Sequence, residues 1–109
     1  MITDVIKNHV ARAAIDALQK GDKHAWRSLF TDNAELFDDG QPRSLKKFEE
    51  DALGHERFLS IDQVTDDGLS IEGEFHSDSW GEFRTYFRFT LNQSEKITRL
   101  DIGQAGTGT

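Results

Sequence analysis

The chain has 109 residues, which is enough for one domain with a single hydrophobic core. Its formal net charge of −7 would repel a phosphate backbone over most of the surface, so we expect no nucleic acid partner. The absence of cysteine excludes disulfide bonds and thiolate chemistry. Residues 1–22 carry scattered charges and no continuous apolar segment, which argues against a signal peptide or a membrane span. We therefore expect a cytoplasmic protein with no membrane partner.

Two helices are expected at the start of the chain. Apolar residues at three- and four-residue spacing predict an amphipathic helix over 4–20. Gly21 suits the left-handed position that ends such a helix, and Asp22 is a good N-cap for a short second helix over 23–30.

A third helix and a sheet follow. A turn at 31–33 leads into a strand over 34–38, and Ser44 would cap a helix over 45–53. From residue 57 onward the apolar residues alternate with a period of two, which predicts an antiparallel meander of strands at 57–64, 69–77, 82–91 and 96–103. We expect an α+β domain in which helices cover one face of a curved antiparallel sheet.

Alternation along the strands assigns their faces. In 82–91 the odd positions form the core face, because they hold most of the phenylalanines. A hairpin to the preceding strand would place Phe75 near Phe83, with Glu74 near Arg84 on the opposite face.

The last strand is expected to pair with 82–91 through the four-residue loop NQSE. This loop would place Phe87 opposite Leu100 and Thr85 opposite Ile102. The core face of the last strand would then be Thr98, Leu100 and Ile102. Asp101 would fall on the outer face.

The stretch LFTDNAELFDDG contains the sharpest candidate for chemistry. Ala34, Leu36 and Asp38 share one face of the predicted strand, which would put Asp38 at the inner rim of the sheet and point Asp39 outward. A carboxyl group in an apolar pocket could act as a general base or acid. The alternative is that DDG is turn chemistry and that Asp38 is solvated.

Three segments together resemble the SnoaL-like branch of the nuclear transport factor 2-like superfamily: AIDALQKGDKHAWRSLFTDNAELFDDG, PRSLKKFEEDAL and FRTYFRF. The resemblance covers nearly the whole chain. It implies a cone-shaped, strongly curved sheet around a central pocket, covered by the three helices, and in many cases a homodimer. We expect residues 1–104 to form this domain and 105–109 to be a flexible C-terminal tail.

Within that superfamily, the closest pattern with known chemistry is that of ketosteroid isomerase, where an aspartate base works with an oxyanion hole of a tyrosine and a protonated aspartic acid. The resemblance places the base at Asp38. The tyrosine position falls on Ala14 and the aspartic acid position on Thr85. Because losing an oxyanion donor costs about 10²-fold or more in rate, this pattern argues against steroid isomerisation.

The expected pocket residues lie on the inner face of the sheet and on the first helix: Ala14, Leu18, Leu36, Phe58, Phe75, Phe83, Thr85, Phe87, Leu100 and Ile102. Thr85 could bind a ligand or could equally be satisfied by a neighbouring strand. The four histidines show no metal-binding spacing, and we expect no metal ion or organic cofactor. His55 could approach the pocket mouth.

The outer face of the sheet carries Arg84, Tyr86 and Arg88, a stripe that would suit a homodimer interface or a solvated, charge-paired surface. Trp80 is either a turn residue over the sheet edge or a dimer contact. Two functions remain open. The first is a cofactor-free isomerase, cyclase or dehydratase that acts on a small apolar, cyclic, carbonyl-bearing molecule through Asp38. The second is a non-catalytic ligand-binding or dimerisation module.

Overall fold

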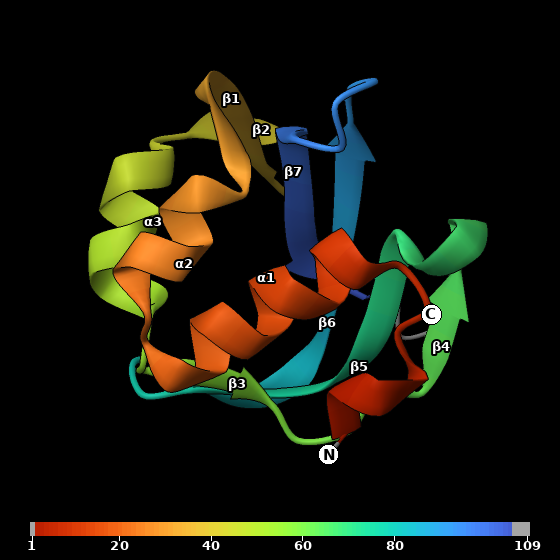
Figure 1. Ribbon diagram of the computed structural model, residues 1–109. Helices are drawn as coiled ribbons and strands as arrows, with labels where there is room; N and C mark the ends of the chain where they lie inside the picture. Colours follow the sequence, from red (N-terminus) through yellow and green to blue (C-terminus); the bar gives the residue numbers. More distant parts are fainter. Residues whose placement is uncertain (1, 106–109) are drawn as a thin grey trace.

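The computed structural model describes residues 2–105, which form an α+β fold of three α-helices and a curved sheet, as the sequence predicts (Figure 1). The sheet has seven strands, where the sequence predicts five. The helices are α1 (His9–Lys20), α2 (Lys23–Ser28) and α3 (Leu45–Ala52), with 3₁₀ turns η1 (Ile2–Val5) and η2 (Asp66–Gly68). The strands are β1 (Phe30–Asp38), β2 (Gln41–Arg43), β3 (Glu56–Phe58), β4 (Gln63–Thr65), β5 (Ser70–Ser77), β6 (Gly81–Leu91) and β7 (Ile97–Gln104).

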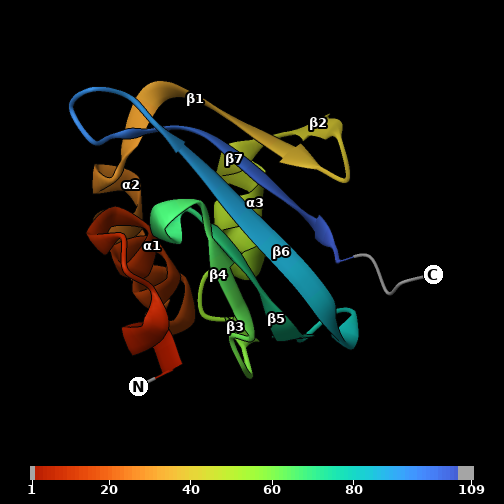
Figure 2. The same ribbon diagram turned by 90° about the vertical axis from the view of Figure 1, so that its right-hand side faces the viewer.

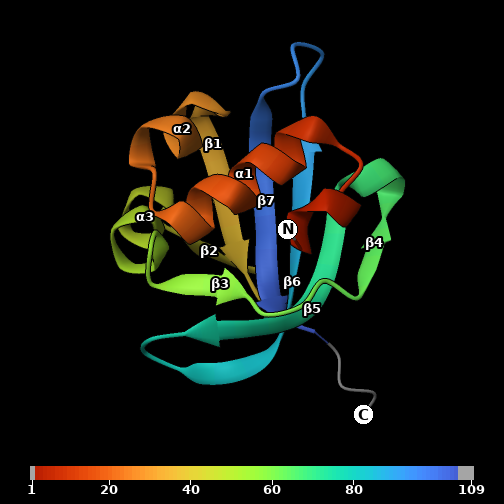
Figure 3. The ribbon, with the colours of Figure 1, turned by 60° about the horizontal axis from the view of Figure 1, so that its bottom comes forward.

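The strand order is β2-β1-β7-β6-β5-β3, and β4 also pairs with β5. The three helices lie together on one side of the sheet (Figure 2). In Figure 3, α1 runs across the sheet in front of β7, and the curved ends of β3, β5 and β6 lie below α1. None of these helices is long and apolar enough to cross a membrane within the described residues.

The first helix is shorter than predicted because Asn8 starts it. Asn8 has an extended backbone, and its side chain accepts hydrogen bonds from the backbone N–H groups of Val10 and Ala11. The expected helix over 4–20 is therefore a 3₁₀ turn followed by α1. Gly21 ends α1 in the left-handed conformation, as predicted.

The first strand, β1, is longer than predicted, and it runs parallel to its neighbour β7. It begins at Phe30, so the expected helical end and the turn at 31–33 are both strand. It pairs in parallel with β7, with Leu36 beside Leu100 and Asp38 beside Ile102. The sheet is therefore mixed, and not wholly antiparallel as predicted.

The expected strand at 57–64 is split into β3 and β4, which both pair with β5. The backbone between them passes close over Gly73, where an added Cβ atom would lie 2.0 Å from the carbonyl oxygen of Ser60. Only glycine allows this approach, so the position of the split depends on a residue without a side chain.

The hairpin of β5 and β6 has the predicted register, with Phe75 opposite Phe83. The pairing of β6 with β7 is shifted by two residues from the prediction, and Phe87 lies opposite Ile102. The connecting turn is longer than expected because the Asn92 side chain accepts hydrogen bonds from two backbone N–H groups within it. A bulge near Thr90 then buries Ile97 in place of the expected Thr98.

Two aromatic groups fill the core. Trp26 packs against Phe30 and Phe48, with ring centroids 4.8 and 6.0 Å away. Phe58 packs edge-on against Phe75 and Phe87 at 5.0 and 5.4 Å. These contacts join the helices to the concave face of the sheet.

The predicted tail begins at Ala105, which is buried, with its backbone N–H donating to the carbonyl oxygen of Arg84 at 3.0 Å. The rest of the predicted tail, residues 106–109, lies outside the described residues.

Candidate functional site

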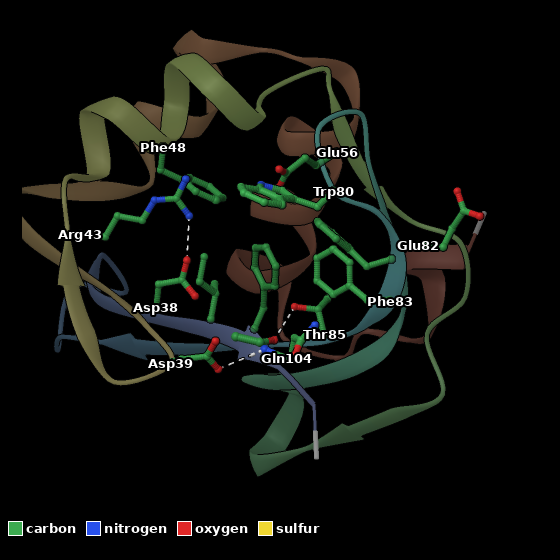
Figure 4. Close-up of a pocket in the computed structure, with 14 residues that line it drawn as sticks. Asp38, Asp39, Arg43, Phe48, Glu56, Trp80, Glu82, Phe83, Thr85 and Gln104 are labelled. Carbon is green, nitrogen blue, oxygen red and sulfur yellow. Dashed lines mark hydrogen bonds and ion pairs between the residues drawn. The ribbon is translucent and has the colours of Figure 1, made fainter. Parts of the chain in front are cut away.

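A cavity of about 400 Å³ opens between the β1–β2 hairpin, β3 and the inner faces of β6 and β7 (Figure 4). One part of its wall is apolar and the other carries charged groups. Its lining residues are Asp38, Asp39, Arg43, Phe48, Glu56, Phe75, Trp80, Glu82, Phe83, Thr85, Phe87, Ile102, Gly103 and Gln104.

The β1–β2 hairpin brings an ion pair to the cavity. Arg43 lies opposite Leu36 in the strand register and so shares the inner face with Leu36 and Asp38. The Arg43 Nη1 atom donates to the Asp38 Oδ2 atom at 2.8 Å, and the two side chains are 33% and 36% exposed. Asp38 therefore lies at the inner rim of the sheet, as the alternation predicts, with one carboxyl oxygen already bonded.

Glu56 contributes a second carboxyl group from β3. It is partly buried, and its Oε2 atom accepts a hydrogen bond from the Ser77 hydroxyl at 3.0 Å. Burial raises the pKa of Glu56, and the negative charges of Asp38 and Asp51 add to that effect. The Ser77 hydrogen bond and the positive charge of Arg43 oppose it. A carboxyl group with a raised pKa beside a cavity is typical of a functional site.

The apolar wall consists of Phe48, Phe75, Phe83, Phe87 and Ile102. The Phe75 and Phe83 rings meet edge-on with centroids 5.8 Å apart, and the Arg43 guanidinium lies 5.2 Å from the centroid of the Phe48 ring. The cavity thus offers flat apolar surfaces next to its charged rim.

Thr85 lies in the apolar wall, but its hydroxyl donates to the carbonyl oxygen of Gly103 at 2.6 Å. This bond agrees with the structural alternative for Thr85. Asp39 belongs to the lining, but its carboxyl group points outward, as expected: its Oδ1 atom accepts from the Gln104 N–H at 3.2 Å and lies on the same side of Gly103 as the hydroxyl of Tyr86, an outer-face residue. The Asp39 backbone takes a φ of 50°, which fits the expected turn before Gly40.

The structure brings together six of the residues predicted for the site and leaves five apart. Those that line the cavity are Asp38, Phe75, Phe83, Thr85, Phe87 and Ile102. Those that lie in the packed core, away from the lining, are Ala14, Leu18, Leu36, Phe58 and Leu100. These five residues lie in the packed core, where α1 covers the concave face of the sheet. We call this region the narrow end of the cone, and the region around the cavity its open end.

Sequence reasoning missed Arg43 and Glu56. Arg43 belonged to no predicted element, although a hairpin strand after Gly40 would have put it on the face of Asp38. Glu56 lies two residues before Phe58 and shares its inward face, but the predicted strand began one residue too late to include it. The two-residue spacing from Phe58 thus indicates the face of Glu56, but it does not show where the strand begins.

The mouth of the cavity carries Trp80, which is 78% exposed, and Glu82. His76 bonds Glu82 through Nδ1 at 2.7 Å and Asp78 through Nε2 at 2.9 Å, and His55 bonds Asp78 at 3.2 Å. The hydrogen bonds to Glu82 and Asp78 raise the pKa of His76. His55 thus lies beside the turn that carries Trp80. Within residues 2–105 no three or more side chains are grouped as a metal site.

The outer face of the sheet is rich in ion pairs. Arg84 lies 2.8 Å from Asp62, 3.5 Å from Glu72 and 3.4 Å from Glu74. Arg99 pairs with Asp101 at 2.9 Å, which is the predicted outer-face position of that aspartate. At these positions the surface is charge-paired.

No protein-family model matches the sequence, and no curated protein sequence does either. Solved structures do match. The Anabaena orange carotenoid protein binding canthaxanthin is 18% identical, with a TM-score of 0.74 over 93% of this chain and 36% of that chain. This chain therefore spans about a third of that protein.

Two further matches span nearly their whole length. A proposed polyketide cyclase from Sinorhizobium meliloti is 17% identical, with a TM-score of 0.71 over 94% of this chain and 98% of that one. A SnoaL-like protein of unknown function from Burkholderia thailandensis is 15% identical, with a TM-score of 0.63 over 96% and 98%. The chain has the SnoaL-like, nuclear transport factor 2-like fold, as the sequence resemblance predicts.

Proposed function

We propose that the chain binds a small, apolar, cyclic molecule that carries a carbonyl group, and that a carboxyl group of the cavity moves a proton on it. The observation that carries this proposal is the cavity itself, in which aromatic side chains face the Arg43–Asp38 pair and Glu56. An apolar pocket with a few convergent polar groups is the usual form of a small-molecule site.

The aromatic wall supports an apolar ring as the body of the ligand. Flat rings of Phe83 and Phe75 offer offset or edge-on contacts, and Trp80 could cover a ligand at the mouth. The likeness to a canthaxanthin-binding protein is in keeping with an apolar ligand, although it rests on the fold.

Proton transfer is the chemistry that the charged rim supports. A carboxyl group next to a carbonyl compound can remove a proton from the carbon beside the carbonyl, and this step needs no metal ion or organic cofactor. Asp38 is the candidate that the sequence predicts for this role.

Binding is tested with a neutral naphthyl ketone whose fluorescence depends on the polarity around it. We expect a saturable blue shift with the unaltered protein. Phe83→Ala should weaken binding about tenfold, because an aromatic contact in a pocket contributes about 1 kcal/mol or more. Leu59→Ala is the matched control, since Leu59 is exposed and is absent from the lining. Equal binding by both variants would place the ketone elsewhere.

A non-catalytic ligand-binding module is the second candidate. It is favoured by the Arg43–Asp38 ion pair, which occupies the carboxylate that the sequence predicts as the base. This function predicts ketone binding without any proton exchange on the bound ketone.

A homodimer through the outer face of the sheet remains a prediction. The ion pairs of Arg84 within its own chain leave fewer free charges for a partner. Sedimentation at several protein concentrations tests it, and a single monomeric species throughout would contradict it.

A further inference from the structure

The geometry points to Glu56 as the group that moves the proton on a neutral ketone in this cavity, while Asp38 positions Arg43 toward the ketone oxygen. This inference rests on the proposed function and assigns its chemistry to a different carboxyl group from the one that the sequence predicts.

Glu56 is anchored at one oxygen and available at the other. Its Oε2 atom is fixed by the hydroxyl of Ser77, a residue only 1% exposed. Within residues 2–105 no hydrogen bond is made to its Oε1 atom, and the side chain lines the cavity beside Trp80 (Figure 4). An anchored carboxyl group with one free oxygen is held in a defined orientation, which is what proton transfer requires.

Within residues 2–105, Asp38 likewise has one bonded oxygen and one without a hydrogen bond, but its partner is different. Its Oδ2 atom is bonded to Arg43, so a full positive charge neutralises the carboxylate, whereas Glu56 is anchored by a neutral hydroxyl. The pair holds the guanidinium at the rim, where further N–H groups of Arg43 can donate to a ligand. Asp38 therefore acts through Arg43 and is a positioning residue.

The charges of the lining select the kind of substrate. Of the four acidic lining residues, Glu82 is bonded to His76 and Asp39 lies beside Tyr86 of the outer face. The described charged groups that face the cavity are therefore the carboxyl groups of Asp38 and Glu56 and the guanidinium of Arg43, which leaves one negative charge in excess when Glu56 is ionised. This excess of negative charge would repel a carboxylate or a phosphate ester. A neutral ketone avoids that repulsion and still offers an oxygen to Arg43.

The step balances without any other reactant. The Glu56 carboxylate removes a proton from the carbon next to the carbonyl, and the C–H electron pair forms the C=C bond of an enolate. The charge that develops on the enolate oxygen is stabilised by the N–H groups of Arg43. The protonated Glu56 then returns the proton to the same carbon or to a conjugated one, which regenerates the carboxylate.

The groups that face Glu56 determine the pH dependence. Burial raises the pKa of Glu56, Asp38 and Asp51 add to the rise, and Ser77 and Arg43 oppose it. The base form is the carboxylate, so the rate should increase as the pH rises through this pKa. A carboxyl group with a raised pKa is also the stronger base once ionised.

The test uses the full chain and β-tetralone, a neutral bicyclic ketone. Proton NMR in deuterated water measures loss of the α-proton signal, and displacement of the naphthyl ketone measures binding separately. We expect Glu56→Gln to lower the exchange rate at saturation about 100-fold or more and to remove its pH dependence. Glutamine can still accept from Ser77, and the melting temperature checks that the variant is folded.

Two further variants separate the roles. Asp38→Asn should weaken apparent affinity for the ketone and keep the pH dependence, because Glu56 is still present. Glu50→Gln makes the same chemical change at an exposed position of α3 and should leave exchange unchanged. The inference is overturned if Glu56→Gln exchanges at the rate of the unaltered protein, or if Asp38→Asn alone removes the pH dependence.

The failure of the inference can be told from the failure of the proposed function. If β-tetralone binds but the unaltered protein exchanges no faster than buffer, the inference is overturned and a binding role survives. If neither ketone binds, the proposed function fails and the inference fails with it.

Discussion

The two ends of the cone are built from the same strands and are used differently. At the narrow end, Phe58 and Leu18 are at most 2% exposed and pack α1 against the sheet. At the open end, the same sheet face continues as Phe83 and Thr85, but α1 does not reach it, and a cavity remains between this face and Phe48 of α3. One strand, β3, joins the two ends, because Phe58 lies in the core and Glu56 lies at the cavity.

Fold stability and ligand binding therefore depend on different parts of one sheet face. Substitutions at the narrow end should lower the free energy of unfolding with little effect on ketone affinity. Substitutions at the open end should lower ketone affinity with little effect on the free energy of unfolding. The predictions below follow from this contrast and run from the largest expected effect to the smallest.

Phe58→Ala should have the largest effect on stability. Phe58 is 2% exposed and meets two other phenylalanines edge-on, so its removal leaves a cavity that the packed core cannot fill. We expect a loss of about 3–5 kcal/mol in the free energy of unfolding, measured by urea denaturation. A loss as small as that of Phe83→Ala, which changes a half-buried residue of the open end, would contradict the contrast.

Asn8→Ala should cost about 1 kcal/mol, because the side chain caps α1 through two backbone N–H groups. Thermal unfolding followed by circular dichroism measures it. Ketone binding by the folded variant should be unchanged, since α1 does not line the cavity. Weakened binding would mean that the two ends are coupled.

The fold could be predicted in most of its parts because local patterns determine them. The caps of α2 and α3, the left-handed Gly21 and the register of β5 with β6 all follow from neighbouring residues. The register of β6 with β7 was wrong, because it depends on a turn built by Asn92 and on a bulge. The parallel pairing of β1 with β7 was also missed, since it joins segments far apart in the chain.

The candidate site was predicted less completely than the fold. Asp38 and Phe83 could be placed by alternation within a single strand. Glu56 and Arg43 could not, because each lies at the end of a three-residue strand whose existence depends on its pairing partner. Which inward residues line a cavity and which are buried depends on where α1 lies, and that is a tertiary contact.

Asp38→Asn should change stability by only about 0.5 kcal/mol, because the ion pair with Arg43 is about a third exposed and such pairs contribute little. Asp38 accepts no backbone hydrogen bond among the described contacts, so the loss of a helix or turn cap is not involved. Chemical denaturation measures the change. A loss above about 2 kcal/mol would mean that the pair belongs to the structural end of the molecule.

His76→Gln should show a stability difference that depends on pH. The pKa of His76 is raised above 6.5 by Glu82 and Asp78, so its stabilisation is fully present at low pH and is lost as the pH rises through the raised value. Melting temperatures should therefore separate at about pH 5 and converge at about pH 9. A difference that stays constant over this range would show that His76 acts through packing alone.

The most direct test is a carbon-13 NMR titration of the Glu56 side-chain carboxyl, without and with β-tetralone. Glu56 is the central group of the open end, and burial and nearby carboxylates raise its pKa. We expect a midpoint above the ordinary glutamate value in the free protein and a further rise when the ketone expels water from the cavity. An ordinary midpoint that the ketone leaves unchanged would contradict the assignment of this cavity as a proton-transfer site built around Glu56.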